Sequence, residues 1–140
     1  MDRIIKEKSC GGVVFLKNDK GILYLIEKMG YGHFSMPKGH VERDETELDT
    51  ALREIKEETG LNVCYVPGFR HKITYSPQVG HTKDVFFFAF RTWSDKVTPQ
   101  KDEVDEISFL PYKQAYEKLT FDTDKETLKF ANEFIKNFAF

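Results

Sequence analysis

The sequence has few cysteines, no long apolar run and no excess of one charge. Cys10 and Cys64 are the only two in 140 residues and form no C-x-x-C pair, so they indicate buried, reduced thiols and no cysteine metal site. The apolar run from 85 to 90 is far too short to span a bilayer. A net charge of −2 argues against a generic nucleic-acid binder or a polybasic membrane anchor.

The rest of the composition is typical of one globular domain over residues 1–140, with 40% hydrophobic and 31% charged residues. The first eight residues are too charged for a signal peptide, so we expect a cytoplasmic location. We also expect a monomer or a weak homodimer, with no membrane and no stable nucleic-acid partner.

Residue patterns predict an α/β fold with a mixed sheet covered on both faces. The glycine pair Gly11 and Gly12 indicates a bulge or a close backbone approach in the first strand. The last helix has a capping-box pattern at Thr123 and Glu126. The predicted strands are about 4–16, 22–27, 69–76, 85–93 and 104–110, and the predicted helices are 46–59, 111–119 and a tail from 123.

The helix 46–59 gathers negative charge on one face. Its apolar residues share the face that should pack on the sheet, whereas Glu54, Glu57 and Glu58 share another, with Glu47 on that side two turns earlier. Such neighbours repel by roughly 0.2–0.5 kcal/mol per pair. A divalent cation would turn this repulsion into attraction, and oxygen ligands suit Mg²⁺ or Mn²⁺. The alternative is a solvated acidic helix face.

The segment from Gly39 to Leu61 reads G-x5-E-x7-R-E-I-x-E-E-x-G-L. This pattern resembles a complete Nudix box, and its many fixed positions make a chance match remote. The resemblance implies the Nudix fold, an α/β/α sandwich with a mixed sheet. It also implies a metal-dependent hydrolase that cuts a phosphate–phosphate bond beside a nucleoside or a similar group.

The resemblance also implies a role for each matching residue. Glu57 and Glu58 would be the main metal ligands, Glu54 a further ligand or the general base, and Gly39 a ligand through its carbonyl. The structural positions of the motif would be Glu45, Arg53 and Gly60.

A general base must accept the proton of the attacking water. Glu54 and Glu103 are both candidates, because Glu103 precedes the strand 104–110 where a loop can return to the metal. The alternative for Glu103 is an ordinary solvated residue of a charged loop.

Flanking residues resemble those of the asymmetric diadenosine tetraphosphate hydrolases within this family. The resemblance implies that a nucleotide substrate binds through cationic and aromatic side chains, and that cleavage gives ATP and AMP. Phe34 and the segment Arg43–Asp44 depart from the subgroup, which usually has Trp and Pro-Gly there. The expected substrate-binding residues are Phe34, Lys38, His40, Tyr75, Lys83 and Phe134.

Alternatives remain open for the substrate and for several of these residues. Phe134 lies on the apolar stripe of the last helix, which also fits a core position. Other substrates are nucleoside triphosphates, including oxidised ones, RNA 5′ ends, nucleotide sugars and inositol pyrophosphates. A non-catalytic nucleotide-sensing module is a third interpretation, and the complete set of glutamates argues against it.

Overall fold

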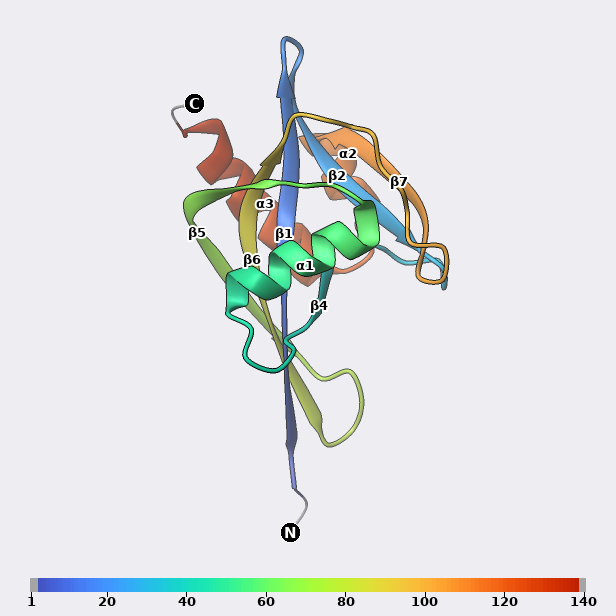
Figure 1. The fold of residues 1–140 in the computed structure, drawn as a ribbon. Coiled ribbons are helices and arrows are strands. Elements are labelled where there is room, and N and C mark those ends of the chain that lie inside the picture. Colours follow the sequence, from blue (N-terminus) through green and yellow to red (C-terminus); the bar gives the residue numbers. More distant parts are fainter. Residues whose placement is uncertain (1–2, 139–140) are drawn as a thin grey trace.

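Two long strands form the centre of a mixed sheet in the computed structural model, which describes residues 3–138 (Figure 1). Strands β1 (Ile5–Asn18) and β6 (His81–Thr92) run parallel and pair from Ile5–His81 to Leu16–Thr92. The next strands pair antiparallel with this centre, which gives the order β3-β2-β1-β6-β5. Their bounds are β2 (Gly21–Met29), β3 (Phe34–Ser35), β4 (Lys38–His40), β5 (Cys64–Tyr75) and β7 (Val104–Pro111).

One edge of β1 is shared by two strands. Strand β2 pairs with residues 15–18 of β1, and β4 pairs with residues 9–11, so the sheet divides between them. At the division the Gly12 N–H donates a hydrogen bond to the Pro37 carbonyl at 3.0 Å. A methyl group on Gly11 would overlap that carbonyl, so the expectation of a close backbone approach here is confirmed.

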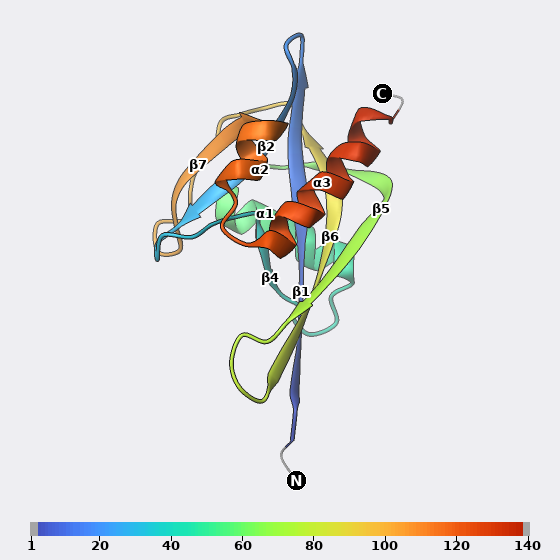
Figure 2. The same ribbon diagram turned by 180° about the vertical axis from the view of Figure 1, so that it is seen from behind.

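Helices cover both faces of the sheet. Helix α1 (Glu47–Thr59) lies on one face, whereas α2 (Tyr112–Lys118) and α3 (Asp122–Lys136) lie on the other (Figure 2). Strand alternation divides the apolar side chains between two cores. The core beneath α1 includes Leu25 and Ile55, and the core beneath α3 includes Tyr24, Ile26 and Leu128.

Helix α1 begins and ends where the sequence predicts. The Thr46 hydroxyl accepts a hydrogen bond from the Asp49 N–H, and the Asp49 side chain accepts one from the Thr46 N–H. Gly60 ends the helix at a φ of 78°, a left-handed conformation that favours glycine.

Three local predictions are wrong. Helix α3 begins at Asp122, one residue before the expected cap, and it has no side-chain cap. The region from Met29 to His40, where the glycines and Pro37 predict a loop, contains β3 and β4, whose short pairings follow from neighbours distant in sequence. Cys10 is buried as expected, but Cys64 is exposed because it lies at the outer start of β5.

A membrane-crossing helix is also absent from residues 3–138, where each helix is too short or too polar to span a bilayer.

Candidate functional site

The glutamates of α1 differ sharply in burial. Glu58 is 2% exposed, because it lies three residues after the buried Ile55 and faces the sheet. The side chain of Glu54 is 14% exposed and that of Glu57 is 50% exposed. Glu58 still interacts with Glu54, as the helical spacing predicts, but it projects into the protein beside the apolar stripe, so the alternative of a solvated acidic face is wrong for Glu58.

Glu47 also departs from the expected acidic face. Arg70 donates two hydrogen bonds to its carboxylate, each 2.9 Å long, and Lys8 forms an ion pair with it at 2.9 Å. The Arg70 guanidinium holds the pKa of Glu47 at about 2. Glu47 therefore ties the start of α1 to β1 and β5, because its register on the helix turns it toward those strands.

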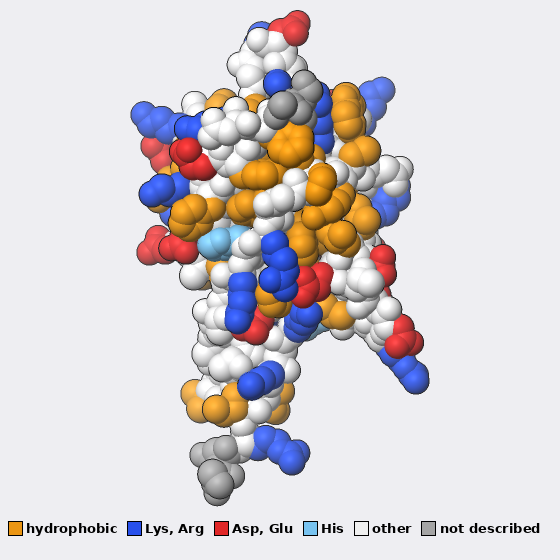
Figure 3. All heavy atoms as spheres, turned by 90° about the vertical axis from the view of Figure 1, so that its left-hand side faces the viewer, with side chains coloured by type: hydrophobic (Ala, Val, Ile, Leu, Met, Phe, Trp, Pro, Cys, Tyr) orange, Lys and Arg blue, Asp and Glu red, His pale blue; other side chains and the backbone are white. Residues whose placement is uncertain are grey.

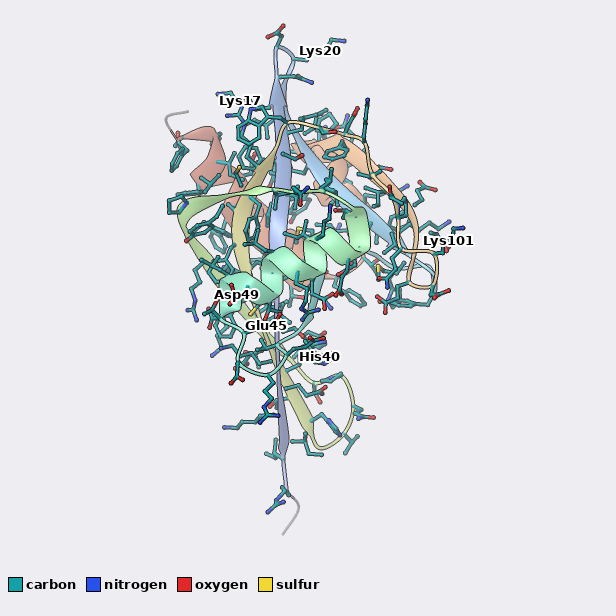
Figure 4. The ribbon with its side chains drawn as sticks, in the orientation of Figure 1. Lys17, Lys20, His40, Glu45, Asp49 and Lys101 are labelled. Atoms are coloured by element: carbon teal, nitrogen blue, oxygen red, sulfur yellow. The ribbon has the colours of Figure 1, made fainter. Side chains whose placement is uncertain are left out.

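Arg53 connects the helix to the loop that precedes it. Its guanidinium donates to Glu45 at 2.7 and 2.9 Å, to Glu54 at 2.8 Å and to the His40 carbonyl at 3.0 Å. These bonds hold the pKa of Glu45 at about 2, chiefly through Arg53. Glu45 and His40 both lie beneath α1 (Figure 4). The network fixes this loop against the helix that carries Glu54.

Gly39 lies directly against Glu54. A methyl group built at Gly39 would overlap the Glu54 carboxylate, so this carboxylate occupies the space that a larger residue would fill. The contact brings the Gly39 backbone on β4 and the Glu54 side chain on α1 to one point, as the proposed role of both in metal binding requires.

Sequence reasoning missed Glu27, which lies on β2 and is fully buried. Both of its carboxylate oxygens, together with Oε2 of Glu58, lack a hydrogen-bond partner. Burial raises the pKa of Glu27, and burial followed by the charge of Glu27 raises the pKa of Glu58. The sequence contains one signal for it: an acidic residue stands two positions after Leu25, where the alternation of Leu23 and Leu25 predicts another inward-facing side chain.

The donor set at this point fits a hard divalent ion. Buried carboxylate oxygens without hydrogen-bond partners, on Glu27 and Glu58, are ligands that Mg²⁺ and Mn²⁺ prefer. Across residues 3–138, no three His, Cys, Asp or Glu side chains are grouped closely enough to hold a metal ion. Arg53 explains this, because it draws Glu54 and Glu57 into ion pairs at 2.8 and 3.3 Å. Metal binding would require those two carboxylates to leave the guanidinium.

Three of the expected substrate-binding residues lie together. Tyr75 and Lys83 are direct partners in the β5–β6 ladder. Burial lowers the pKa of the Lys83 ammonium, and the charge of Lys38 lowers it further. This group of two lysines and a tyrosine lies toward α3, while Lys38 also acts electrostatically on Glu27. Lys38 is therefore within electrostatic reach of both Glu27 and Lys83.

Asp124 is a second residue that the sequence reasoning missed. It lies in the first turn of α3 and is 3% exposed. Burial raises the pKa of its carboxyl to about 6, and Lys38 partly offsets this rise. Its position in an acidic, helix-starting segment gave no signal, because first-turn aspartates are common on exposed helices.

The remaining expected residues lie in other surroundings. Lys118 places its ammonium 4.5 Å from the centre of the Phe34 ring. His40 is exposed and pairs with Glu7 at 3.3 Å. Phe134 packs on Gly68 and Phe69, ten residues and about 15 Å along α3 from Asp124. Figure 3, which views the molecule from the left-hand side of Figure 1, shows hydrophobic side chains gathered over the middle of that side.

Glu103 lines a pocket of about 470 Å³ with Met29, Gly30, Tyr31 and Asp102. The Gly30 N–H donates to the Glu103 carbonyl at 2.8 Å, which joins the turn after β2 to the loop before β7. The charge of Glu103 also raises the pKa of Glu27. The loop thus brings Glu103 within electrostatic reach of the buried carboxylates.

Comparisons with known proteins identify the family of the chain. The NUDIX domain model matches residues 9–131. A stretch of 106 residues is 36% identical to the 8-oxo-(d)GTP phosphatase of Mycolicibacterium smegmatis, over 75% of this chain but only 32% of that protein. The chain is 27% identical to the asymmetrical bis(5′-nucleosyl)-tetraphosphatase of Rattus norvegicus over 139 residues, which are 91% of this chain and 95% of that protein.

The fold has close structural neighbours. A C. elegans Ap4A hydrolase in a binary complex superposes with a TM-score of 0.86 over 94% of this chain and 99% of that one, at 23% sequence identity. The likeness confirms the predicted α/β fold with a mixed sheet between helices.

Proposed function

The chain belongs to the NUDIX family, and from this premise we propose that it hydrolyses a phosphoanhydride bond of a nucleoside polyphosphate with Mg²⁺ or Mn²⁺. The substrate we propose is diadenosine tetraphosphate, cleaved asymmetrically to ATP and AMP. The observation that carries the proposal is the position of Lys38: the next residue, Gly39, lies against the Glu54 carboxylate, and the Lys38 ammonium acts electrostatically on both Glu27 and Lys83. A polyphosphate can extend from one group to the other.

The acidic side of the site would hold the metal. Glu57 and Glu58 are the proposed main ligands, with Glu54 and the Gly39 carbonyl beside them. Bound Mg²⁺ supplies charge neutralisation for the polyphosphate and a more acidic water. Glu45 and Arg53 hold the loop and orient Glu54 through the bonds already described.

The proton of the attacking water requires a carboxylate. Glu54 is one candidate, since it lies among the proposed ligands and against Gly39. Glu103 is the other, since it lines the adjacent pocket and its exposed carboxylate can approach from the loop before β7. Replacing each with Gln separates them, because loss of the base lowers kcat and removes the acidic limb of the pH–rate profile.

The basic side of the site would bind the rest of the substrate. Lys38 and Lys83 provide two cations for the oxygens of a long phosphate chain. Tyr75, beside Lys83, offers an aromatic face on which an adenine ring can stack. Phe34, His40 and Phe134 are proposed as further contacts with the substrate; in its absence they contact Lys118, Glu7 and Phe69, respectively.

A second candidate substrate is an oxidised nucleoside triphosphate. The observation that favours it is the 36% identity to the M. smegmatis 8-oxo-(d)GTP phosphatase. Such a substrate has a shorter phosphate chain and one base, so it would use fewer of the cationic and aromatic side chains.

A substrate panel tests these proposals. Purified protein with Mg²⁺ would be incubated with diadenosine tetraphosphate, 8-oxo-dGTP, unmodified nucleoside triphosphates, capped RNA and ADP-ribose, and initial rates compared at equal concentrations. We expect the highest kcat/KM for the tetraphosphate, with ATP and AMP as products. Much faster turnover of 8-oxo-dGTP would favour the second candidate, and nucleotide binding without turnover would indicate a sensing module.

A further inference from the structure

The position of Glu27 follows from the alternation of strand β2. Tyr24 and Ile26 enter the core beneath α3, whereas Leu25 enters the core beneath α1. Side chains two residues apart share a face of a strand, so Glu27 points toward α1 as Leu25 does. On the facing side of α1, Glu58 is buried as well. Two acidic side chains therefore occupy one interior space between helix and sheet.

Burial without a partner is costly for Glu27. The residue is 0% exposed, and neither carboxylate oxygen has a hydrogen-bond partner outside the acidic pair that Glu27 forms with Glu58. Removing a carboxylate from water without compensation costs several kcal/mol, on the order of 2–7 kcal/mol even for a neutral polar group. Leucine would continue the apolar pattern of the strand at no such cost. A cation bound at this point would explain why the strand has a glutamate here.

We propose that Glu27 is an additional carboxylate ligand of the divalent ion and binds it together with Glu58. This inference rests on the proposed metal-dependent function and adds to it a ligand from outside the helix motif. Mg²⁺ commonly uses one or two protein carboxylates and completes its shell with water and phosphate oxygens. The Glu27 and Glu58 pair supplies that number from two different elements, β2 and α1.

The surroundings of the pair support a cation there. Glu54 and Glu103 both act on Glu27 as further negative charges, and Lys38 is the positive charge that acts on it. Among the described residues, no ion pair joins Glu27 to Lys38 or to any other cation within the 4 Å that such a pair requires. The charge of Lys38 also acts on Lys83 and on Asp124, so its effect is not confined to neutralising Glu27.

The test measures metal binding by the full chain without nucleotide. Wild type and Glu27→Gln would be titrated with Mn²⁺, with free Mn²⁺ followed by electron paramagnetic resonance. Glutamine keeps the size of the side chain and removes its charge. We expect Mn²⁺ affinity to fall at least 10-fold in Glu27→Gln. Glu106→Gln on β7, an exposed carboxylate, is the matched control and should bind as wild type does.

Thermal unfolding gives a second readout that separates a ligand from a structural residue. In EDTA, Glu27→Gln should melt at or above the temperature of wild type, because a buried charge has been removed. Saturating Mn²⁺ should raise its melting temperature less than it raises that of wild type. A carboxyl needed only for packing would instead give a lower melting temperature in EDTA and an unchanged Mn²⁺ effect.

Wild-type Mn²⁺ affinity in Glu27→Gln would overturn the inference. If this variant does not fold, Glu27→Asp serves instead, because it keeps the charge but withdraws it by one methylene and should also weaken Mn²⁺ binding. The proposed function fails separately: wild type that binds Mn²⁺ and hydrolyses no nucleotide would refute the activity while leaving Glu27 as a ligand.

Discussion

The proposed metal-binding carboxylates and the proposed phosphate-binding lysines lie on opposite faces of the sheet and are held differently. On the α1 face, carboxylates are buried or locked: Glu58 is 2% exposed, and Glu45 and Glu54 are held by Arg53. On the α3 face, Lys38, Lys83 and Tyr75 are only partly buried. The difference indicates that ion pairs with Arg53 hold Glu54 and Glu57 in the absence of metal and must open before these carboxylates can bind one, whereas Lys38, Lys83 and Tyr75 remain partly accessible to a ligand.

The largest expected effect comes from the acidic face. Glu57→Gln should lower kcat/KM by about 10²- to 10³-fold, which corresponds to roughly 2.7–4 kcal/mol of barrier, because a metal-binding charge is lost. The side chain is half exposed, so stability should change little. Steady-state kinetics and urea unfolding measure the two quantities. The exposed Glu117→Gln is the control, and equal activity in the two variants would remove Glu57 from the metal site.

The second effect tests the rigidity of that face. Arg53→Ala should lower the free energy of unfolding by about 2–3 kcal/mol, because its charged hydrogen bonds to Glu45 and Glu54 are lost. Urea denaturation measures this loss. Arg43→Ala removes an exposed arginine from the same loop and should stay within about 0.5 kcal/mol of wild type. An equal loss of unfolding free energy in both variants would show that the hydrogen bonds of Arg53 do not stabilise this face.

The third effect concerns the buried acid on the basic face. Burial raises the Asp124 pKa from 3.8 to about 6, so the folded state binds the proton more tightly than the unfolded state. Stability from this group is complete below pH 3.8 and is lost as pH rises through about 6. Asp124→Asn should therefore gain about 2 kcal/mol relative to wild type between pH 4 and pH 8. Urea unfolding at both pH values measures it, and a constant difference would contradict this assignment.

The smallest expected effect concerns Lys83 on the basic face. Lys83→Met should lower kcat/KM for diadenosine tetraphosphate by about 10-fold, or ~1.4 kcal/mol, and should affect a nucleoside triphosphate less. Lys20→Met is the control, since Lys20 lies at the turn between β1 and β2, far from His40 (Figure 4). Equal losses of kcat/KM for both substrates would show that Lys83 does not discriminate between phosphate chains of different length.

Short sequence patterns were enough to predict some of the helix and strand boundaries. The bounds of α1 follow from Thr46 and Gly60, whose effects reach only a few residues along the chain. The strand that begins at Val104 follows from a similarly short pattern. The glutamates of α1 were also found, because helical spacing fixes which of them are neighbours.

Features that depend on distant partners were not predictable in this way. Strand β4 exists because Gly39 pairs with Cys10. The inward direction of Glu58 depends on the sheet beneath α1, whereas helix periodicity alone predicted only that it is a neighbour of Glu54. Glu27 and Asp124 gain their unusual surroundings from elements far along the chain.

The pairing of β1 with β6 has a consequence for how the molecule folds. Ile5 meets His81, so the two central strands are joined only after more than half of the chain exists. Pairings of such long sequence separation carry a large loop-closure cost and slow folding. The helix with its glutamates precedes β6 in the chain, yet the sheet on which it docks is complete only later. During synthesis, the proposed metal ligands on α1 are therefore made well before the surface that brings them together.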